Sequence, residues 1–195
     1  MFDGFPKYRE WLGWIFLAVA VWVYIFINTP KISRIEFYDL DSSGVEEKFE
    51  LANGTLQIWT GDKLIFSSKP EYFVDNYAIG DSNNDGVVEL NMGFWRTGDY
   101  GKDFEYAKTR RDPLKSYHLY LYQLMPNGTA LKLVWGSSTL NDPLFSFYVK
   151  AVTDNTYMLS VETGSYADYD RYGQIRPLET SDWMWNGWWF SKQDQ

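Results

Sequence analysis

The 195-residue sequence contains no cysteine and a single histidine, His118. Without cysteine the chain has no disulfides, no thiolate metal sites and no thiol nucleophiles. Basic residues are also few, because 18 Lys and Arg stand against 26 Asp and Glu, for a net charge of -8. A surface of this sign repels phosphate, so we expect no nucleic acid among the partners.

The short motifs of common enzyme classes are also missing. The sequence has no Gly-x-Ser-x-Gly elbow, no His-Glu-x-x-His pair, no phosphate-binding Gly-rich loop and no dinucleotide fingerprint. His118 lies in an alternating segment, where a surface or cross-strand role is commoner than general-base catalysis. A hydrolase that uses two carboxylates stays a third alternative, because many Asp and Glu pairs exist. We predict a non-enzymatic protein.

Residues 11–27 are uncharged and almost entirely apolar. At a rise of about 1.5 Å per residue, with polar-aromatic flanks added, they cover nearly the hydrocarbon thickness of a bilayer. Trp11 and Trp14 lie near one end and Trp22 and Tyr24 near the other, as amphipathic rings prefer the headgroup level. We therefore predict a single-pass transmembrane helix over 11–28.

The flanks of this segment bear on its processing and orientation. A cleaved signal peptide is the alternative, since basic residues precede the run and Ala18-Val19-Ala20 resembles a cleavage site. The apolar run continues beyond that site, which favours the uncleaved anchor. Basic residues are equal in number on the two sides, so the acidic bulk of the chain decides our choice. We predict a cytoplasmic tail, 1–10, and a periplasmic or extracellular domain beyond the helix.

After a predicted linker, 29–34, the sequence changes to short alternating segments separated by turn dipeptides. Such segments predict strands at 35–38, 56–59, 63–66, 87–94, 116–124, 130–135, 145–152, 157–161 and 183–190. The turns carry Asn53-Gly54, Gly61-Asp62, Asn127-Gly128 and Asn186-Gly187. The pattern favours an all-β domain over 35–191, with a short tail at 192–195.

Two acidic segments in this domain are similar. They start at Asp39 and Asp81, which are 42 positions apart, and each has acidic or polar residues at alternate positions, Gly at the sixth and Glu at the ninth. Each is followed, after a variable interval, by a hairpin, and residues 183–191 form a third hairpin of related sequence. The third copy has lost its acidic loop, of which only Asp154 remains. The chain therefore contains about three degenerate repeats.

The segment Asp81-Ser-Asn-Asn-Asp-Gly-Val-Val-Glu89 resembles the loop of FG-GAP or VCBS repeats, which precedes an apolar strand of a propeller blade. The resemblance extends over most of residues 35–191 and implies antiparallel sheets like propeller blades. About three repeats fall short of the roughly four to eight blades of closed propellers. We therefore predict an open set of sheets that is not a closed propeller, with a β-sandwich as the alternative.

The oxygen-rich loops are candidate calcium sites, because Ca²⁺ takes six to eight oxygen ligands. The predicted ligands are the side chains of Asp81, Asn83, Asp85 and Glu89 and the backbone carbonyl of Val87. A weaker second loop offers Asp39, Asp41, Ser43 and Glu47. Such an ion would brace a strand connection rather than catalyse, and a tight turn without metal is the alternative.

Residues 183–190 contain four tryptophans and a phenylalanine. Exposed rings of this kind form sugar-stacking or protein-binding surfaces, whereas a packed hairpin is the simpler interpretation. The candidate patch is Trp183, Trp185, Trp188 and Trp189. Our leading hypothesis is an accessory or scaffolding subunit of a membrane protein assembly, in contact with the lipid bilayer and other protein subunits. The second is a surface-anchored, calcium-dependent carbohydrate or matrix-binding module.

Overall fold

The computed structural model describes residues 32–97, 115–168 and 175–193. The predicted cytoplasmic tail and transmembrane helix lie outside these ranges. Within them, no helix is long and apolar enough to cross a membrane. The chain divides into two units, Met1–Ile32 and Ser33–Gln195, and the second holds the β domain. The first strand begins at Ile32, before the predicted domain start at residue 35.

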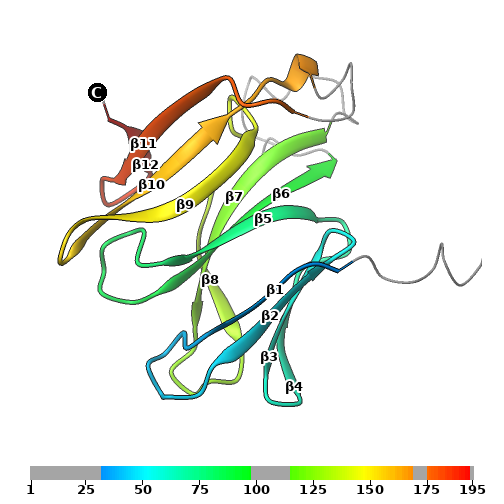
Figure 1. Ribbon diagram of the computed structural model, residues 1–195, viewed down its shortest axis with the longest axis vertical. Coiled ribbons are helices and arrows are strands. Elements are labelled where there is room, and N and C mark those ends of the chain that lie inside the picture. Colours follow the sequence, from blue (N-terminus) through cyan, green and yellow to red (C-terminus); the bar gives the residue numbers. More distant parts are fainter. Residues whose placement is uncertain (1–31, 98–114, 169–174, 194–195) are drawn as a thin grey trace, which may run out of the picture. The chain divides into compact units, whose positions relative to one another are not determined.

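Twelve strands in the described ranges form three antiparallel four-stranded sheets, each in chain order (Figure 1). Sheet 1 contains β1 (Ile32–Tyr38), β2 (Glu47–Ala52), β3 (Thr55–Thr60) and β4 (Lys63–Ser67). Sheet 2 contains β5 (Phe73–Gly80), β6 (Glu89–Thr97), β7 (Lys115–Leu124) and β8 (Leu131–Gly136). Sheet 3 contains β9 (Leu144–Thr153), β10 (Thr156–Thr163), β11 (Glu179–Trp185) and β12 (Phe190–Lys192). The predicted all-β class with open antiparallel sheets is confirmed.

Two strands were missing from the prediction. The strand β2 follows directly on the acidic loop. Because it begins with the charged sequence Glu-Lys-Phe-Glu, it cannot be distinguished from the loop by sequence alone. In β5 the pairing register shifts between Val74 and Asn76, so the extra residue, Asp75, breaks the alternation that identifies a strand. The predicted strand 183–190 is the hairpin β11–β12, because Asn186-Gly187 forms its turn.

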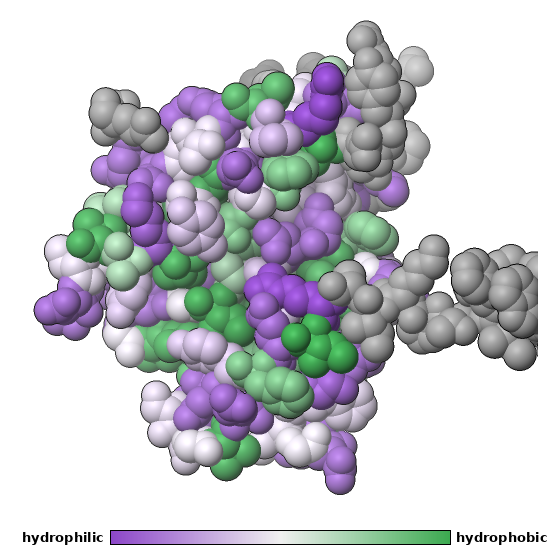
Figure 2. Space-filling model, in the orientation of Figure 1, coloured by the Kyte–Doolittle hydropathy of each residue, from purple (hydrophilic) through white to green (hydrophobic). Residues whose placement is uncertain are grey.

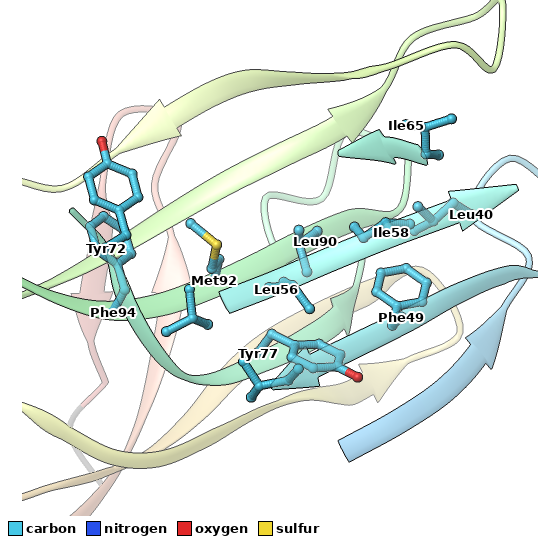
Figure 3. Packing of buried hydrophobic residues seen from close by; sticks show 12 residues of the cluster. Leu40, Phe49, Leu56, Ile58, Ile65, Tyr72, Tyr77, Leu90, Met92 and Phe94 are labelled. Carbon is cyan, nitrogen blue, oxygen red and sulfur yellow. The ribbon is translucent and has the colours of Figure 1, made fainter. Parts of the chain in front are cut away.

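Sheet 2 lies between the other two and is buried on both faces. From β6, Leu90, Met92 and Phe94 join a cluster with residues of sheet 1. Figure 3 shows Leu90 and Met92 near Leu56, and Phe94 beside Tyr72. Trp95 and the buried leucines of β7 join a second cluster with residues of sheet 3. Each fully buried side chain of this size contributes roughly 1.5 to 3 kcal/mol.

The turn between β2 and β3 shows why its sequence is Asn-Gly. Asn53 and Gly54 have φ of 50° and 76°, the left-handed pair that matches the twist of a two-residue hairpin. A Cβ on Gly54 would lie 2.4 Å from the Phe73 ring, so only glycine fits there. This hairpin brings the start of β5 against sheet 1.

Candidate functional site

The two acidic segments form the same turn at the same place in their sheets. Loop 1 (residues 39–47) connects β1 to β2, and loop 2 (residues 81–89) connects β5 to β6. The fourth residue has a φ of 58° in Ser42 and 60° in Asn84. The sixth has 84° in both Gly44 and Gly86. The repeat inferred from sequence is therefore also a repeat of backbone conformation.

The acidic residues of both loops bind the loop backbone. In loop 1 the Asp39 carboxylate accepts the amides of Ser43 (3.0 Å) and Gly44 (2.7 Å), and in loop 2 Asp81 accepts those of Asp85 (3.1 Å) and Gly86 (2.9 Å).

The ninth residue closes each turn. Glu47 accepts the Leu40 amide at 3.0 Å, and Glu89 accepts the Ser82 amide at 2.8 Å. The turn thus uses its first and ninth acids as caps, whereas the sequence analysis considered these two residues only as ligands of a metal ion.

Three carboxylates also converge in each loop. Atoms of Asp81, Asp85 and Glu89 lie within 4.8 Å of one another, and those of Asp39, Asp41 and Glu47 do the same. Exposed acidic groups often cluster without an ion. The other predicted ligands share these loops: Asn83 Oδ1 accepts the Asp85 amide at 2.9 Å, the Val87 amide donates to Asp85 at 2.8 Å, and Ser43 Oγ accepts the Val45 amide.

The carboxylates of the loops differ in their electrostatics. Glu89 is fully buried, and burial raises its pKa to about 7, aided by the nearby charge of Asp85. Its hydrogen bond from Gln123 Nε2, 2.8 Å long, opposes that shift. Asp41, in loop 1, is exposed, and its pKa is lowered by a hydrogen bond with Ser43.

The third sheet lacks an acidic loop, as the sequence predicts. Its β9–β10 connection is a tight turn at Asp154-Asn155. Loop 2 reaches this hairpin through Asn84, whose side chain accepts the Tyr157 amide (2.7 Å) and donates to the Tyr157 carbonyl (3.1 Å). The paired hydrogen bonds fasten loop 2 of sheet 2 to sheet 3.

The predicted aromatic patch divides into two parts. Trp183 packs into the cluster between sheets 2 and 3, and Trp185 makes edge contacts with Trp135 and Phe190. Trp188 and Trp189, at the tip of the β11–β12 hairpin, are 76% and 56% exposed. Asn186 Oδ1 accepts both of their amides, at 3.1 and 3.0 Å, so this side chain caps the turn at the tip.

The first strands of the three sheets line an open groove that sequence reasoning missed. This groove, of about 730 Å³, runs between β1, β5 and β9. Arg34 crosses it, lying 4.0 Å from the Tyr77 ring and donating to Glu36 (2.7 Å) and the Tyr77 carbonyl (2.8 Å). Figure 2 shows hydrophobic and hydrophilic residues side by side on this face of the domain. The alternating sequence of β1 indicates which of its residues point outward. The groove could not be predicted, because β5, which forms one of its walls, was not recognised as a strand.

A second missed feature is Asp75, the bulged residue of β5. Its carboxylate accepts the Tyr117 hydroxyl at 2.6 Å and the Trp95 indole at 2.9 Å, joining three strands of sheet 2. Desolvation raises its pKa to about 6, while both hydrogen bonds oppose the shift. Asp75 as a whole residue is exposed at the surface, so contact with water also limits the rise of this pKa.

A comparison of the chain with protein-family models, curated proteins and solved structures finds no match. The resemblance to FG-GAP or VCBS repeats therefore stays a prediction that rests on the loop residues.

Proposed function

We propose that this chain is a non-enzymatic accessory subunit, anchored in a membrane by residues 11–28, whose β domain packs on a larger membrane protein assembly. The supporting observation is the groove between β1, β5 and β9. Three of its lining residues, Ile35, Phe37 and Tyr148, are 45%, 60% and 57% exposed. Contiguous exposed aromatic and aliphatic surface is typical of protein interfaces.

The test is purification of the tagged full-length chain from native membranes in mild detergent. We expect fixed partner subunits to stay with the wild type and to be lost from the double variant Phe37→Ser, Tyr148→Ser. Leu178→Ser is the matched control, because Leu178 is 65% exposed and lies outside the groove. A wild-type chain that purifies alone contradicts the proposal.

A second candidate function is a calcium-dependent carbohydrate or matrix-binding module. The observation in its favour is the exposed Trp188-Trp189 tip, since flat rings stack on sugar faces. We expect glycan-array binding to be lost in Trp188→Ala and kept in Val134→Ala, an exposed site on β8. A well-folded wild type that binds no glycan excludes this function.

Calcium binding by the loops is proposed on the spacing of their oxygen donors. Titration calorimetry on the full chain should give two binding events, of which Asp81→Asn removes the tighter and Asp39→Asn the weaker. Ca²⁺ at about one hundred times its Kd stabilises a protein by about 2.7 kcal/mol. If the titration gives no heat and Ca²⁺ does not shift the Tm, both loops are turns that bind no metal.

A further inference from the structure

A small pocket lies at the edge of sheet 3, apart from the groove. Its volume is about 280 Å³, and its lining residues come from β11, β12, the end of β10 and the connection between β8 and β9, residues 137–143. Figure 1 shows β11 and β12 beside each other at this edge of the sheet. The volume is close to the lower end of small-molecule sites, which run from about 300 to 1,000 Å³. The pocket therefore has room for a single ring-shaped ligand.

One side of the pocket is aromatic. Trp183 from β11 and Phe190 from β12 line it, and both rings are half-buried against the core between sheets 2 and 3. This packing holds the two rings at the pocket without the help of a ligand. Flat rings that are partly accessible can contact the apolar C–H face of a sugar ring.

A buried hydroxyl group lies on the same side of β11 as Trp183. Ser181 is 3% exposed, and it shares this face because alternate residues of a strand point the same way. Its Oγ accepts the Trp183 indole N–H at 3.0 Å. Within the described ranges the Ser181 hydroxyl donates to no other residue, so its proton is available to a ligand oxygen.

Asn141 and Asp142 add polar groups from the connection between β8 and β9. Both are exposed, and within the described part of the chain neither side chain makes a hydrogen bond. The amide of Asn141 can donate and accept, whereas the carboxylate of Asp142 can only accept. Because sugar hydroxyls both donate and accept, a sugar ring can pair with each of these groups.

The charges at the pocket disfavour other small ligands. Glu179 and Lys192 form an ion pair with each other, which leaves the Asp142 carboxylate as the unpaired charge among the described lining residues. This charge repels phosphates and carboxylates. An alkylammonium ion would suit Asp142 and the aromatic rings, but it has no atom that can accept the proton of Ser181. It would leave this buried donor without a partner, so a neutral sugar fits better.

We propose that this pocket binds one ring of a neutral sugar, whose apolar face lies on the two aromatic rings and whose hydroxyls bond to Ser181, Asn141 and Asp142. The proposal goes beyond the accessory role, because none of these residues lines the groove. It shares only its ligand class with the second candidate function, whose Trp188-Trp189 tip lies outside the pocket.

The test is saturation-transfer NMR on the full-length chain, in a detergent without a sugar headgroup. The probes are the methyl glycosides of glucose, galactose, mannose and N-acetylglucosamine, with tetramethylammonium as the cation probe. We expect the wild type to bind at least one glycoside, and the pocket variant, Asn141→Ala with Asp142→Ala, to raise its Kd at least about tenfold. The matched control, Asp154→Ala with Asn155→Ala, removes the same two residue types from the exposed turn between β9 and β10 and should keep the wild-type Kd.

Trp188→Ala separates the pocket from the tip, and we expect it to keep the wild-type Kd as well. Glycoside binding that survives in the pocket variant overturns the inference, and its loss in Trp188→Ala instead would support the second candidate function. Binding of tetramethylammonium alone, lost in the pocket variant, overturns it by assigning the pocket to cations. A folded wild type that binds none of the four glycosides also overturns it, whereas the accessory role is decided separately by the co-purification of partner subunits.

Discussion

Loop 1 and loop 2 fold alike but have different interiors. At the second loop position and at the third residue of the following strand, loop 1 has Leu40 and Phe49, which belong to the core between sheets 1 and 2. Loop 2 has Ser82 and Asn91 at these positions, joined by a hydrogen bond of 2.6 Å and both fully buried. The turn accepts an apolar or a polar pair as long as both members match.

The loops also differ in what surrounds them. Loop 2 is joined to sheet 3 through Asn84 and to β7 through Gln123, which donates to both Glu89 and Asp85 at 2.8 Å. In loop 1 the residue equivalent to Asn84 is Ser42, which is exposed. The same local sequence thus forms a tertiary junction in one sheet and a surface turn in the other.

The largest expected effect comes from removing the buried glutamate of each loop. At about pH 6 we expect Glu89→Ala to lower the free energy of unfolding by about 3 kcal/mol, because a buried amide loses its acceptor and a cavity forms. Glu47→Ala should cost about 2 kcal/mol, since its second acceptor contact, from Thr60, is 3.3 Å long. Urea unfolding followed by tryptophan fluorescence measures both, and Glu89→Gln, which keeps an acceptor, is the control. Equal losses at the two sites would contradict the comparison.

A smaller effect should appear in the pH dependence of stability. The pKa of Glu89 rises from 4.5 to about 7 on folding, so between these values the folded state keeps a proton that the unfolded state has lost. In calcium-free buffer, stability should therefore fall as the pH rises through this window, by at most about 1.4 kcal/mol per unit. Urea midpoints across the window measure the slope, and Glu89→Gln should flatten it. A slope that is unchanged in Glu89→Gln would assign the effect to another group.

The smallest effect should come from the residue with positive φ at the fourth loop position. We expect Asn84→Gly to cost about 1 kcal/mol, because glycine keeps the backbone conformation but loses both hydrogen bonds to Tyr157. Ser42→Gly should be neutral or slightly stabilising, since it removes only the strain of a side chain at positive φ. Thermal unfolding compares the two variants. If Ser42→Gly lowers the stability as much as Asn84→Gly does, the two hydrogen bonds between Asn84 and Tyr157 contribute nothing to stability.

Much of the β domain was predictable because its signals are local. Asn-Gly turns, alternating strands and the nine-residue acidic pattern each act within a few residues, and the described strands follow them closely. The failures lie where tertiary contacts override the local pattern. In β5 the Asp75 bulge is stabilised by Tyr117 and Trp95, which are distant in sequence.

The candidate site divides in the same way. Sequence placed the acids of both loops in one turn each, but it assigned the first and ninth acids to metal, because backbone amides are invisible in a residue pattern. It grouped four tryptophans, although only Trp188 and Trp189 are exposed at the hairpin tip. The sequence did not predict the groove, because β1, β5 and β9 share no pattern that would show that they lie side by side.

The sequence by itself determined the local conformations: which residues turn, which alternate, and that the acidic turn occurs twice and is lost a third time. These follow from φ preferences and from hydrogen bonds within nine residues. Only the tertiary structure decided which face of each sheet is buried, that sheet 2 is covered on both sides, and that Glu50 and Asp182 lie on the faces of sheets 1 and 3 that point away from sheet 2. Those outcomes depend on contacts between sheets. An apolar and a polar cross-strand pair are both compatible with the same strand conformation, so the local sequence does not show which face a neighbouring sheet covers.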